Sequence, residues 1–233
     1  AAQDSIILMT RQNCQGDVPE QINIQSFFED ENGDLLIGTW GQGLFRYITQ
    51  ENRFVHYSLD EVNSILSLYK DSKGSIWMGS SGSGLHQIQF SSNKEEATIK
   101  TYRHNDKDHS SISSDYIYSI DEDPQTQSLW FGTRNGLSIM HLNKEGTFIN
   151  YQDSGSEYCL PVHEVNSVFR DKNGLIWIGT KGAGVFYVDT RTSSFQIFHS
   201  RGSKTLFTDY ISALYVEENG AIWAGFGYGV DYY

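Results

Sequence analysis

The apolar positions of this chain recur in one phrase that appears five times between residues 24 and 233. Each copy opens with a short run of β-branched and aromatic residues, passes through a polar turn, and reaches a second apolar run that contains a glycine. The opening residues are Ile24, Ile65, Ile117, Val165 and Ile211. A fixed phrase at irregular spacing indicates a repeated structural unit joined by loops of variable length.

The fourth copy shows how one unit is built. Strands are predicted over residues 165–170, 175–180, 185–189 and 194–199. The turn at 171–174 ends in Asn173 and Gly174, which tolerate positive φ and therefore suit a tight hairpin. Each unit is thus predicted to be a four-stranded antiparallel sheet.

The second strand of each unit is apolar at consecutive residues, as in "LIWIG" at 175–179. That pattern is typical of a strand covered on both faces. Four-stranded sheets that repeat about every 45 residues and cover one another are the blades of a β-propeller. We therefore predict an all-β fold, a single β-propeller domain over residues 1–233. The predicted blades span about 22–58, 63–102, 115–152, 163–199 and 209–233, with strand 4–10 completing the last.

Three residue types recur at fixed places in the units. Tryptophan in the second strand should pack between one blade and the next, and Leu36 takes its place in the first unit. The glycine two residues later lets a neighbouring backbone approach closely. An aspartate before the turn can accept hydrogen bonds from the turn amides. These residues are Trp77, Trp130, Trp177 and Trp223; Gly38, Gly79, Gly132, Gly179 and Gly225; and Asp30, Asp71 and Asp171.

The two ends of the chain are complementary. The fifth unit stops at Tyr233 after three strands, and the apolar run at 4–10 resembles a fourth strand without its first three. Joining them would close a ring of five blades and remove an exposed sheet edge. The alternative is a fragment of a longer array, with an open end or a swapped partner. Cys14 and Cys159 precede blades that lie two or three positions apart, so a disulfide between them is not expected.

Charge and composition exclude several classes of function. The net charge of −12 disfavours nucleic acid and anionic membrane surfaces as partners, because both need positive charge on the protein. No apolar run reaches the roughly 18 residues needed to cross a membrane. The first ten residues lack the basic region of a secretory leader. Either a leader has been removed or the chain is an excised piece.

No catalytic or cofactor motif stands out. Serine-hydrolase, zinc-protease and phosphate-loop signatures are missing. The polar loop at 104–115 lacks the glycine and glutamate positions of a calcium loop. We therefore expect this segment to have no enzymatic activity, no cofactor and no metal. A propeller lyase or hydrolase ranks last among the functions considered, because nothing in the sequence brings carboxylates together in one pocket.

The phrase D-x-x-G-x-(I/L)-W-(I/M)-G-(T/S) resembles the two-component regulator propeller repeat, and the resemblance covers nearly all of residues 22–233. It implies a periplasmic sensor segment of a hybrid two-component regulator that responds to oligosaccharides from dietary or host glycans. A small β-sandwich, a membrane helix, a histidine kinase and a DNA-binding regulator would follow in the parent protein. The family usually carries more blades, arranged in two rings, so five copies are a departure from its pattern.

Propeller topology predicts where a ligand would bind. Loops between strands two and three share one face, around the central channel, with the loops that enter the next blade. The candidate ligand-binding residues on this face are Trp40, Arg134, Lys181 and Tyr228 from the first kind of loop and Tyr116, Glu164 and Tyr210 from the second. Aromatic and planar polar groups suit an oligosaccharide ligand. The alternative is a protein-interaction or homodimerisation scaffold without a small ligand.

Overall fold

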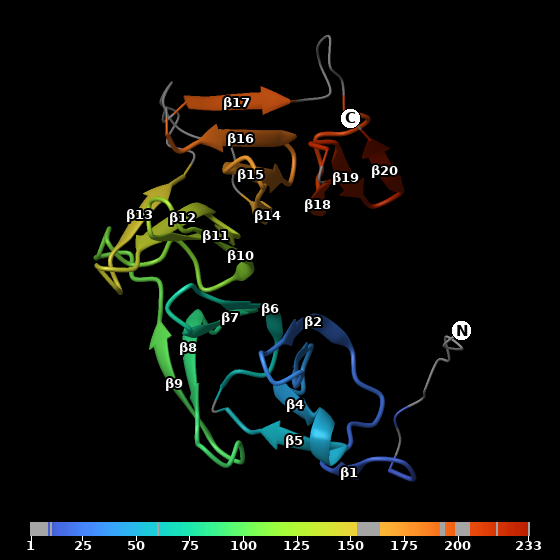
Figure 1. Ribbon diagram of the computed structural model, residues 1–233. Helices are drawn as coiled ribbons and strands as arrows, with labels where there is room; N and C mark the ends of the chain where they lie inside the picture. Colours follow the sequence, from blue (N-terminus) through green and yellow to red (C-terminus); the bar gives the residue numbers. More distant parts are fainter. Residues whose placement is uncertain are drawn as a thin grey trace.

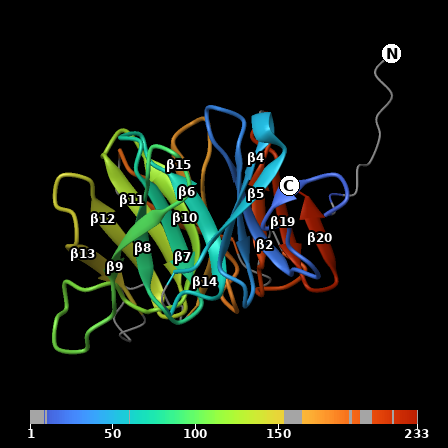
Figure 2. The same ribbon diagram turned by 90° about the horizontal axis from the view of Figure 1, so that it is seen from below.

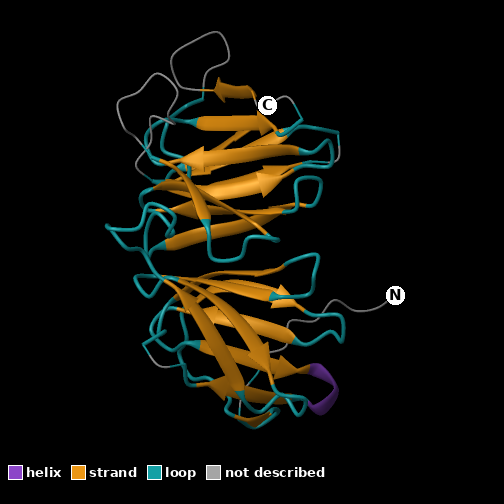
Figure 3. Cartoon of the chain, turned by 90° about the vertical axis from the view of Figure 1, so that its left-hand side faces the viewer, coloured by secondary structure: helices purple, strands orange, loops and turns teal. Residues whose placement is uncertain are grey.

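The computed structural model describes residues 9, 11–59, 61–152, 164–191, 206–217 and 219–232, and the backbone of 194–198. Within them the chain folds as five antiparallel sheets arranged around a common axis (Figure 1). Figure 3 shows strands and loops almost throughout, with a short 3-10 helix, η1 (Thr49–Glu51). The predicted all-β propeller architecture is confirmed.

Each sheet corresponds to one copy of the repeat, and we call the sheets blades one to five. Blade one contains β2 (Ile24–Glu29), β3 (Leu35–Thr39), β4 (Leu44–Ile48) and β5 (Arg53–Tyr57). Blade two contains β6 (Ile65–Lys70), β7 (Ile76–Ser80), β8 (Leu85–Phe90) and β9 (Ala97–Tyr102). Blade three contains β10 (Ile117–Asp123), β11 (Ser128–Thr133), β12 (Gly136–His141) and β13 (Phe148–Tyr151). Blade four contains β14 (Val165–Arg170), β15 (Leu175–Thr180), β16 (Val185–Asp189) and β17 (Ser194–Phe198). Blade five contains β18 (Ala213–Val216), β19 (Ile222–Phe226) and β20 (Gly229–Tyr232).

Strands pair in chain order within every blade, and the first strand of each lies nearest the axis (Figure 1). Blade one has an additional outer strand, β1 (Gln15–Gly16), which pairs in parallel with β5. Viewed from below, the sheets stand face to face (Figure 2). We call the side of a blade that meets the preceding blade its leading face, and the opposite side its trailing face.

Four hydrophobic clusters join the blades in succession, from blade one to blade five. The second-strand tryptophans lie in these clusters: Trp77, Trp130 and Trp177 are only 1%, 5% and 5% exposed. Leu36 fills the same place in blade one and is fully buried. The predicted packing of this position between consecutive blades is therefore confirmed for the first four blades. Burying side chains of this kind contributes about 1.5–3 kcal/mol each.

The turn aspartate also binds the tryptophan, which the sequence pattern did not indicate. Oδ1 of Asp71 accepts the turn amides of Lys73 and Ser75 at 3.0 and 2.8 Å, as predicted. Its Oδ2 accepts the indole Nε1–H of Trp77 at 2.8 Å. Blade four repeats the arrangement with Asp171 and Trp177. A buried indole N–H needs an acceptor, so the aspartate and the tryptophan of one repeat depend on each other.

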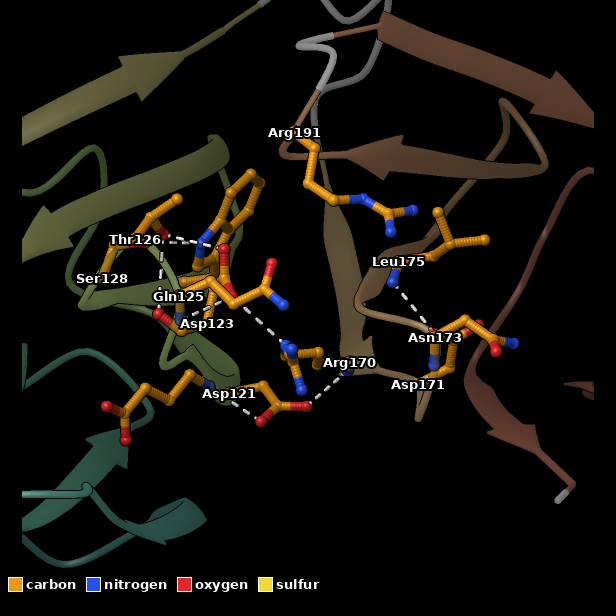
Figure 4. A network of polar contacts seen from close by, with 12 residues as sticks. Asp121, Asp123, Gln125, Thr126, Ser128, Arg170, Asp171, Asn173, Leu175 and Arg191 are labelled. Carbon is orange, nitrogen blue, oxygen red and sulfur yellow. Dashed lines mark hydrogen bonds and ion pairs between the residues drawn. The ribbon is translucent and has the colours of Figure 1, made fainter.

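Polar contacts reinforce the interface between blades three and four on the side of these turns (Figure 4). The backbone N–H of Arg170, at the end of β14, donates to Oδ2 of Asp121 at 2.6 Å. Its guanidinium Nε donates to Oδ1 of Asp123 at 3.2 Å. Burial raises the pKa of the Asp121 carboxyl, and the Arg170 amide opposes that rise. The two blades are thus joined by hydrogen bonds as well as by apolar packing.

The recurring glycines allow the next blade to approach. A methyl group built on Gly79 would lie 2.9 Å from Cβ of Ile117 in blade three and 2.3 Å from Oγ of Ser67 in its own blade. Built at Gly38 it would meet Ile65 of blade two at 2.7 Å. Gly225 is different, because the nearest atom is 3.6 Å away. The predicted role of the glycine is confirmed wherever a described blade packs on that side.

The outer faces of blades one and five differ from the internal interfaces. On the leading face of blade one, Ile37, Phe45 and Phe54 are covered by the segment 14–22, through Val18 at its centre. On the trailing face of blade five the apolar side chains are open: Tyr215, Val230 and Tyr232 are 58%, 53% and 55% exposed. Within the described residues no hydrophobic cluster joins blade five to blade one.

Two expectations fall largely outside the described residues. The strand at 4–10, expected to complete blade five, lies outside them apart from Met9. Cys159 also lies outside them, whereas Cys14 is the first residue of the segment that covers blade one and packs against the same hydrophobic cluster.

The glycine comparison gives a stability prediction. Gly79→Ala should lower the free energy of unfolding by about 1–3 kcal/mol, because the methyl group forces Ile117 and Ser67 to move in a closely packed interface. Gly225→Ala is the matched control and should change it by less than about 0.5 kcal/mol. Urea unfolding measured by tryptophan fluorescence tests both. Equal losses would contradict the assigned role of the glycine.

A double-mutant cycle tests the aspartate–tryptophan pair. Asp71→Asn places an amide N–H against either the indole N–H or the turn amides, and should cost about 1–3 kcal/mol of stability. In a Trp77→Phe background the same change should cost less, because the indole donor is gone. We expect a coupling free energy of about 1–2 kcal/mol from urea unfolding. Additive losses would show that the carboxylate serves the turn alone.

Candidate ligand-binding cavity

In blades one to four, a slip in strand pairing directs one residue into the central channel. In β2, β6, β10 and β14 the pairing with the second strand skips one residue, directly after the opening apolar residue. Such bulges re-aim a side chain away from the ladder. The skipped residues are Gln25, Leu66, Tyr118 and Asn166, and Ser212 occupies the same place in blade five.

All five of these residues line one cavity of about 450 Å³. The other lining residues are Trp40, Ser81, Tyr116 and Arg134. Every blade therefore contributes to a single concave site at the axis of the molecule. Such clefts, lined by aromatic residues and a few convergent polar groups, are where small ligands usually bind.

The repeat separates structural positions from channel positions. The residues on either side of the skipped position barely vary: an isoleucine or valine precedes it, and a serine follows it in blades one to four. The opening residue packs in an interface between blades, as Ile65 does, and the serine packs against the recurring glycine, as Ser67 does. The skipped position itself is glutamine, leucine, tyrosine, asparagine or serine. Sequence reasoning missed these five residues, although this variation within a constant phrase was the available signal.

Loops at the mouth of the cavity are held by backbone hydrogen bonds. The turn after the second strand donates from Trp40, Ser81, Arg134 and Lys181 to the carbonyls of Asn23, Ser64, Tyr116 and Glu164 at 2.8–3.1 Å. Each acceptor lies at the entry of the same blade. Two of the turns also reach the next entry, since the amides of Gly82 and Gly182 donate to Asp115 and Asp209. These hydrogen bonds hold the backbone of the loops in place, and the loop side chains project from it at the mouth of the cavity.

A charged and aromatic cluster occupies this mouth between blades three and four. The Arg134 guanidinium carbon lies 5.0 Å from the centre of the Tyr116 ring. Glu164 accepts from Lys181 Nζ at 2.6 Å and lies 3.8 Å from Arg134 Nε. The hydrogen bond from Lys181 to Glu164 raises the pKa of the lysine. Burial raises the pKa of the Tyr118 phenol, and the negative charge of Glu164 adds to the effect.

The structure brings together most of the residues predicted from topology. Trp40, Tyr116 and Arg134 line the cavity, and Glu164 and Lys181 extend it through their ion pairs. Tyr210 is bridged to Lys181 through the backbone and is 63% exposed. Tyr228 lies in the β19–β20 turn, is 99% exposed, and is not among the residues that line the cavity.

The described residues that line the cavity offer rings and planar amides to a ligand. None of the nine lining residues is a carboxylate, and the nearby Glu164 is already paired with two cations. Glycoside hydrolysis needs two carboxyl groups on either side of the scissile bond. Trp40, which is 52% exposed, and Tyr116 offer ring faces, while Gln25 and Asn166 offer planar amides. These groups match the apolar and hydroxyl surfaces of a sugar.

Two other hollows have fewer features of a ligand-binding site. A cavity of about 530 Å³ lies between blade one and the segment that covers it, and is lined by Asp17, Gln42 and His56 among others. It belongs to one end of the array. The loop at 104–111 frames a polar hollow in which His104 is already bonded to Ile112 and Asp106. Across the described ranges, no three His, Cys, Asp or Glu residues are grouped as a metal site would require.

Comparisons with known proteins agree with the fold and the repeat. The family model described as the two component regulator propeller matches residues 61–82 and 159–182. No curated protein matches the chain. In the part of the chain that the structure describes, no helix is long and apolar enough to cross a membrane.

Three solved structures show the same architecture. The extracellular domain of the putative hybrid two component system BT3049 from B. thetaiotaomicron is 22% identical, with a TM-score of 0.70 over 91% of this chain and 28% of that chain. The extracellular domain of the putative one component system BT4673 from the same organism is 19% identical, with a TM-score of 0.70 over 94% and 28%. PorZ, a surface component of the type-IX secretion system of Porphyromonas gingivalis, is 19% identical, with a TM-score of 0.70 over 89% and 31%.

This chain therefore spans less than a third of the length of the structures it matches. At these identities the likeness shows the fold, and the repeat model assigns the phrase from which that fold is built. The matched residues 61–82 run from the entry of blade two through its second strand, and 159–182 cover the corresponding part of blade four. Two segments of the chain thus match the two-component regulator propeller repeat, and the chain has the fold of the extracellular domains that it resembles.

Proposed function

We propose that this chain is a non-enzymatic sensor propeller of a two-component regulator and that it binds an oligosaccharide in the channel cavity. The observation that carries the proposal is the convergence of side chains from all five blades on a single hollow, four of them from residues that the strand pairing skips. A ligand there touches every blade at once, so its binding free energy can alter the relative positions of the blades. A sensor needs this differential interaction with two states of the protein.

The proposed location is extracytoplasmic, and periplasmic in particular. Two of the similar structures are extracellular domains of putative one component and hybrid two component systems. An extracytoplasmic sensor has no need of catalysis, so the proposal assigns no enzymatic activity to this chain. In this proposal the output, a kinase or a regulator, belongs to the parent protein.

A second candidate function is that of a protein-interaction or dimerisation scaffold. The observation that favours it is the open trailing face of blade five, with Tyr215, Val230 and Tyr232 more than half exposed. Val185 of blade four, which occupies the same position as Val230, is covered by blade five and only 2% exposed. Similarity to PorZ, a component of a secretion system, shows that this fold is also used outside signalling.

Binding to a panel of glycan oligosaccharides tests the sensor proposal. Calorimetry should detect at least one ligand, and Tyr118→Ala should weaken its binding about tenfold, or 1.4 kcal/mol, because the ring contacts the ligand. Tyr215→Ala is the matched control on the trailing face of blade five, and it should leave the affinity for the oligosaccharide unchanged. Thermal melts verify that both variants are folded. Absence of binding to any oligosaccharide, or equal affinity of Tyr118→Ala and the unaltered protein, would refute this function.

Solution mass tests the scaffold function. If the open face of blade five mediates dimerisation, light scattering should show a dimer that Val230→Asp dissociates, because a buried charge opposes association. A monomer at every concentration would exclude this candidate.

A further inference from the structure

The mouth of the cavity carries an excess of positive charge on a strongly acidic chain. The sequence has a net charge of −12, yet Arg134 and Lys181 stand together at the mouth with Glu164 as the carboxylate between them. The nearby Asp115 is engaged elsewhere, by Arg103 at 3.7 Å and by the His104 amide at 2.8 Å. Within the ion-pair cluster of the described residues, two cations share the single carboxylate of Glu164, which leaves this cluster with a net positive charge.

Arg134 is held in place without being saturated. A cation–π contact with Tyr116, 5.0 Å from the guanidinium carbon to the ring centre, restrains the side chain, and the backbone N–H of Arg134 is bonded to the carbonyl of Tyr116. The Arg134 Nε to Glu164 distance of 3.8 Å is an ion pair, longer than a hydrogen bond. The side chain is 57% exposed. A guanidinium held this way presents its N–H fork to an incoming planar anion with little further loss of entropy.

Lys181 supplies a second cation on the adjacent turn. Its ammonium group is bonded to Oε2 of Glu164, while Arg134 faces Oε1 of the same carboxylate. The Glu164 side chain is only 18% exposed, and it lies between the side chains of Lys181 and Arg134, which are more exposed. An ammonium group has three N–H donors, and the ion pair to Glu164 accounts for one of them. Lys181 can therefore bind an anion while it keeps this ion pair.

We infer that the cavity selects a saccharide that carries a carboxylate, which Arg134 and Lys181 bind while Trp40 and Tyr116 contact the sugar rings. The inference rests on the proposed function and specifies the class of ligand. A carboxylate matches the fork of arginine in two parallel hydrogen bonds, which a hydroxyl group cannot do. A neutral sugar of the same shape would leave both cations unmatched.

Calorimetry with two disaccharides of the same linkage tests the inference. The probes are α-1,4-digalacturonic acid and its neutral counterpart, α-1,4-galactobiose, at pH 7. The unaltered protein should bind the acidic probe at least about tenfold more tightly, a difference of 1.4 kcal/mol. Added salt should narrow the difference, because the mouth is exposed to solvent.

Variants of the cluster distinguish ligand recognition from damage to the fold. Arg134→Gln and Lys181→Gln should each reduce the preference for the acidic probe, and Lys144→Gln, an exposed lysine on the outer side of blade three, should not. Glu164→Gln should strengthen binding of the acidic probe several-fold, because it removes the competing carboxylate. A gain of this kind cannot arise from misfolding.

The outcomes separate the inference from the proposed function. Equal binding of both probes, or a preference for the neutral one, overturns the inference and leaves the sensor function standing. Binding of neither probe, while other neutral oligosaccharides bind, also overturns it. Loss of all glycan binding overturns both.

Discussion

The fold depends on one constraint: no blade can bury its own two apolar faces. At the four internal interfaces the cover is the neighbouring sheet, which has to come within van der Waals contact. The recurring glycine makes this approach possible next to the axis, where Ile117 sits against Gly79. Two residues earlier on the same strand, a large side chain is needed to fill the space between the blades. Trp77 does so, and its indole N–H is satisfied by Asp71 of the same repeat.

These packing residues hold the blades together, so the side chains that line the channel do not have to contribute to the interfaces. The bulge that follows each opening residue takes one side chain out of the interface and turns it toward the axis. Leu66 and Asn166 occupy equivalent places but offer quite different surfaces to a ligand. Recognition can therefore change one blade at a time without disturbing the contacts that hold the blades together.

Much of this architecture could be predicted from the sequence, because the repeat aligns five copies against one another. Strands, turns, the buried tryptophan and the spacing glycine follow from residue type and period. The channel residues were missed, because a bulge depends on pairing register, which periodicity does not reveal; their variation within a constant phrase was the only sign of them in the sequence. Loop topology correctly grouped Tyr116 and Arg134. It could not tell that Tyr228 would stand apart, since the direction of an exposed turn side chain depends on local backbone geometry.

The segment that covers the leading face of blade one has a consequence for assembly. Head-to-tail polymerisation of copies would require the open face of blade five to dock on that surface, as consecutive blades dock within the molecule. Val18 already occupies its outer half, against Phe45 and Phe54. Among the described residues, the outer face of blade one is thus covered and that of blade five is exposed. Such an asymmetry opposes the open-ended fibres that a heterologous contact otherwise produces.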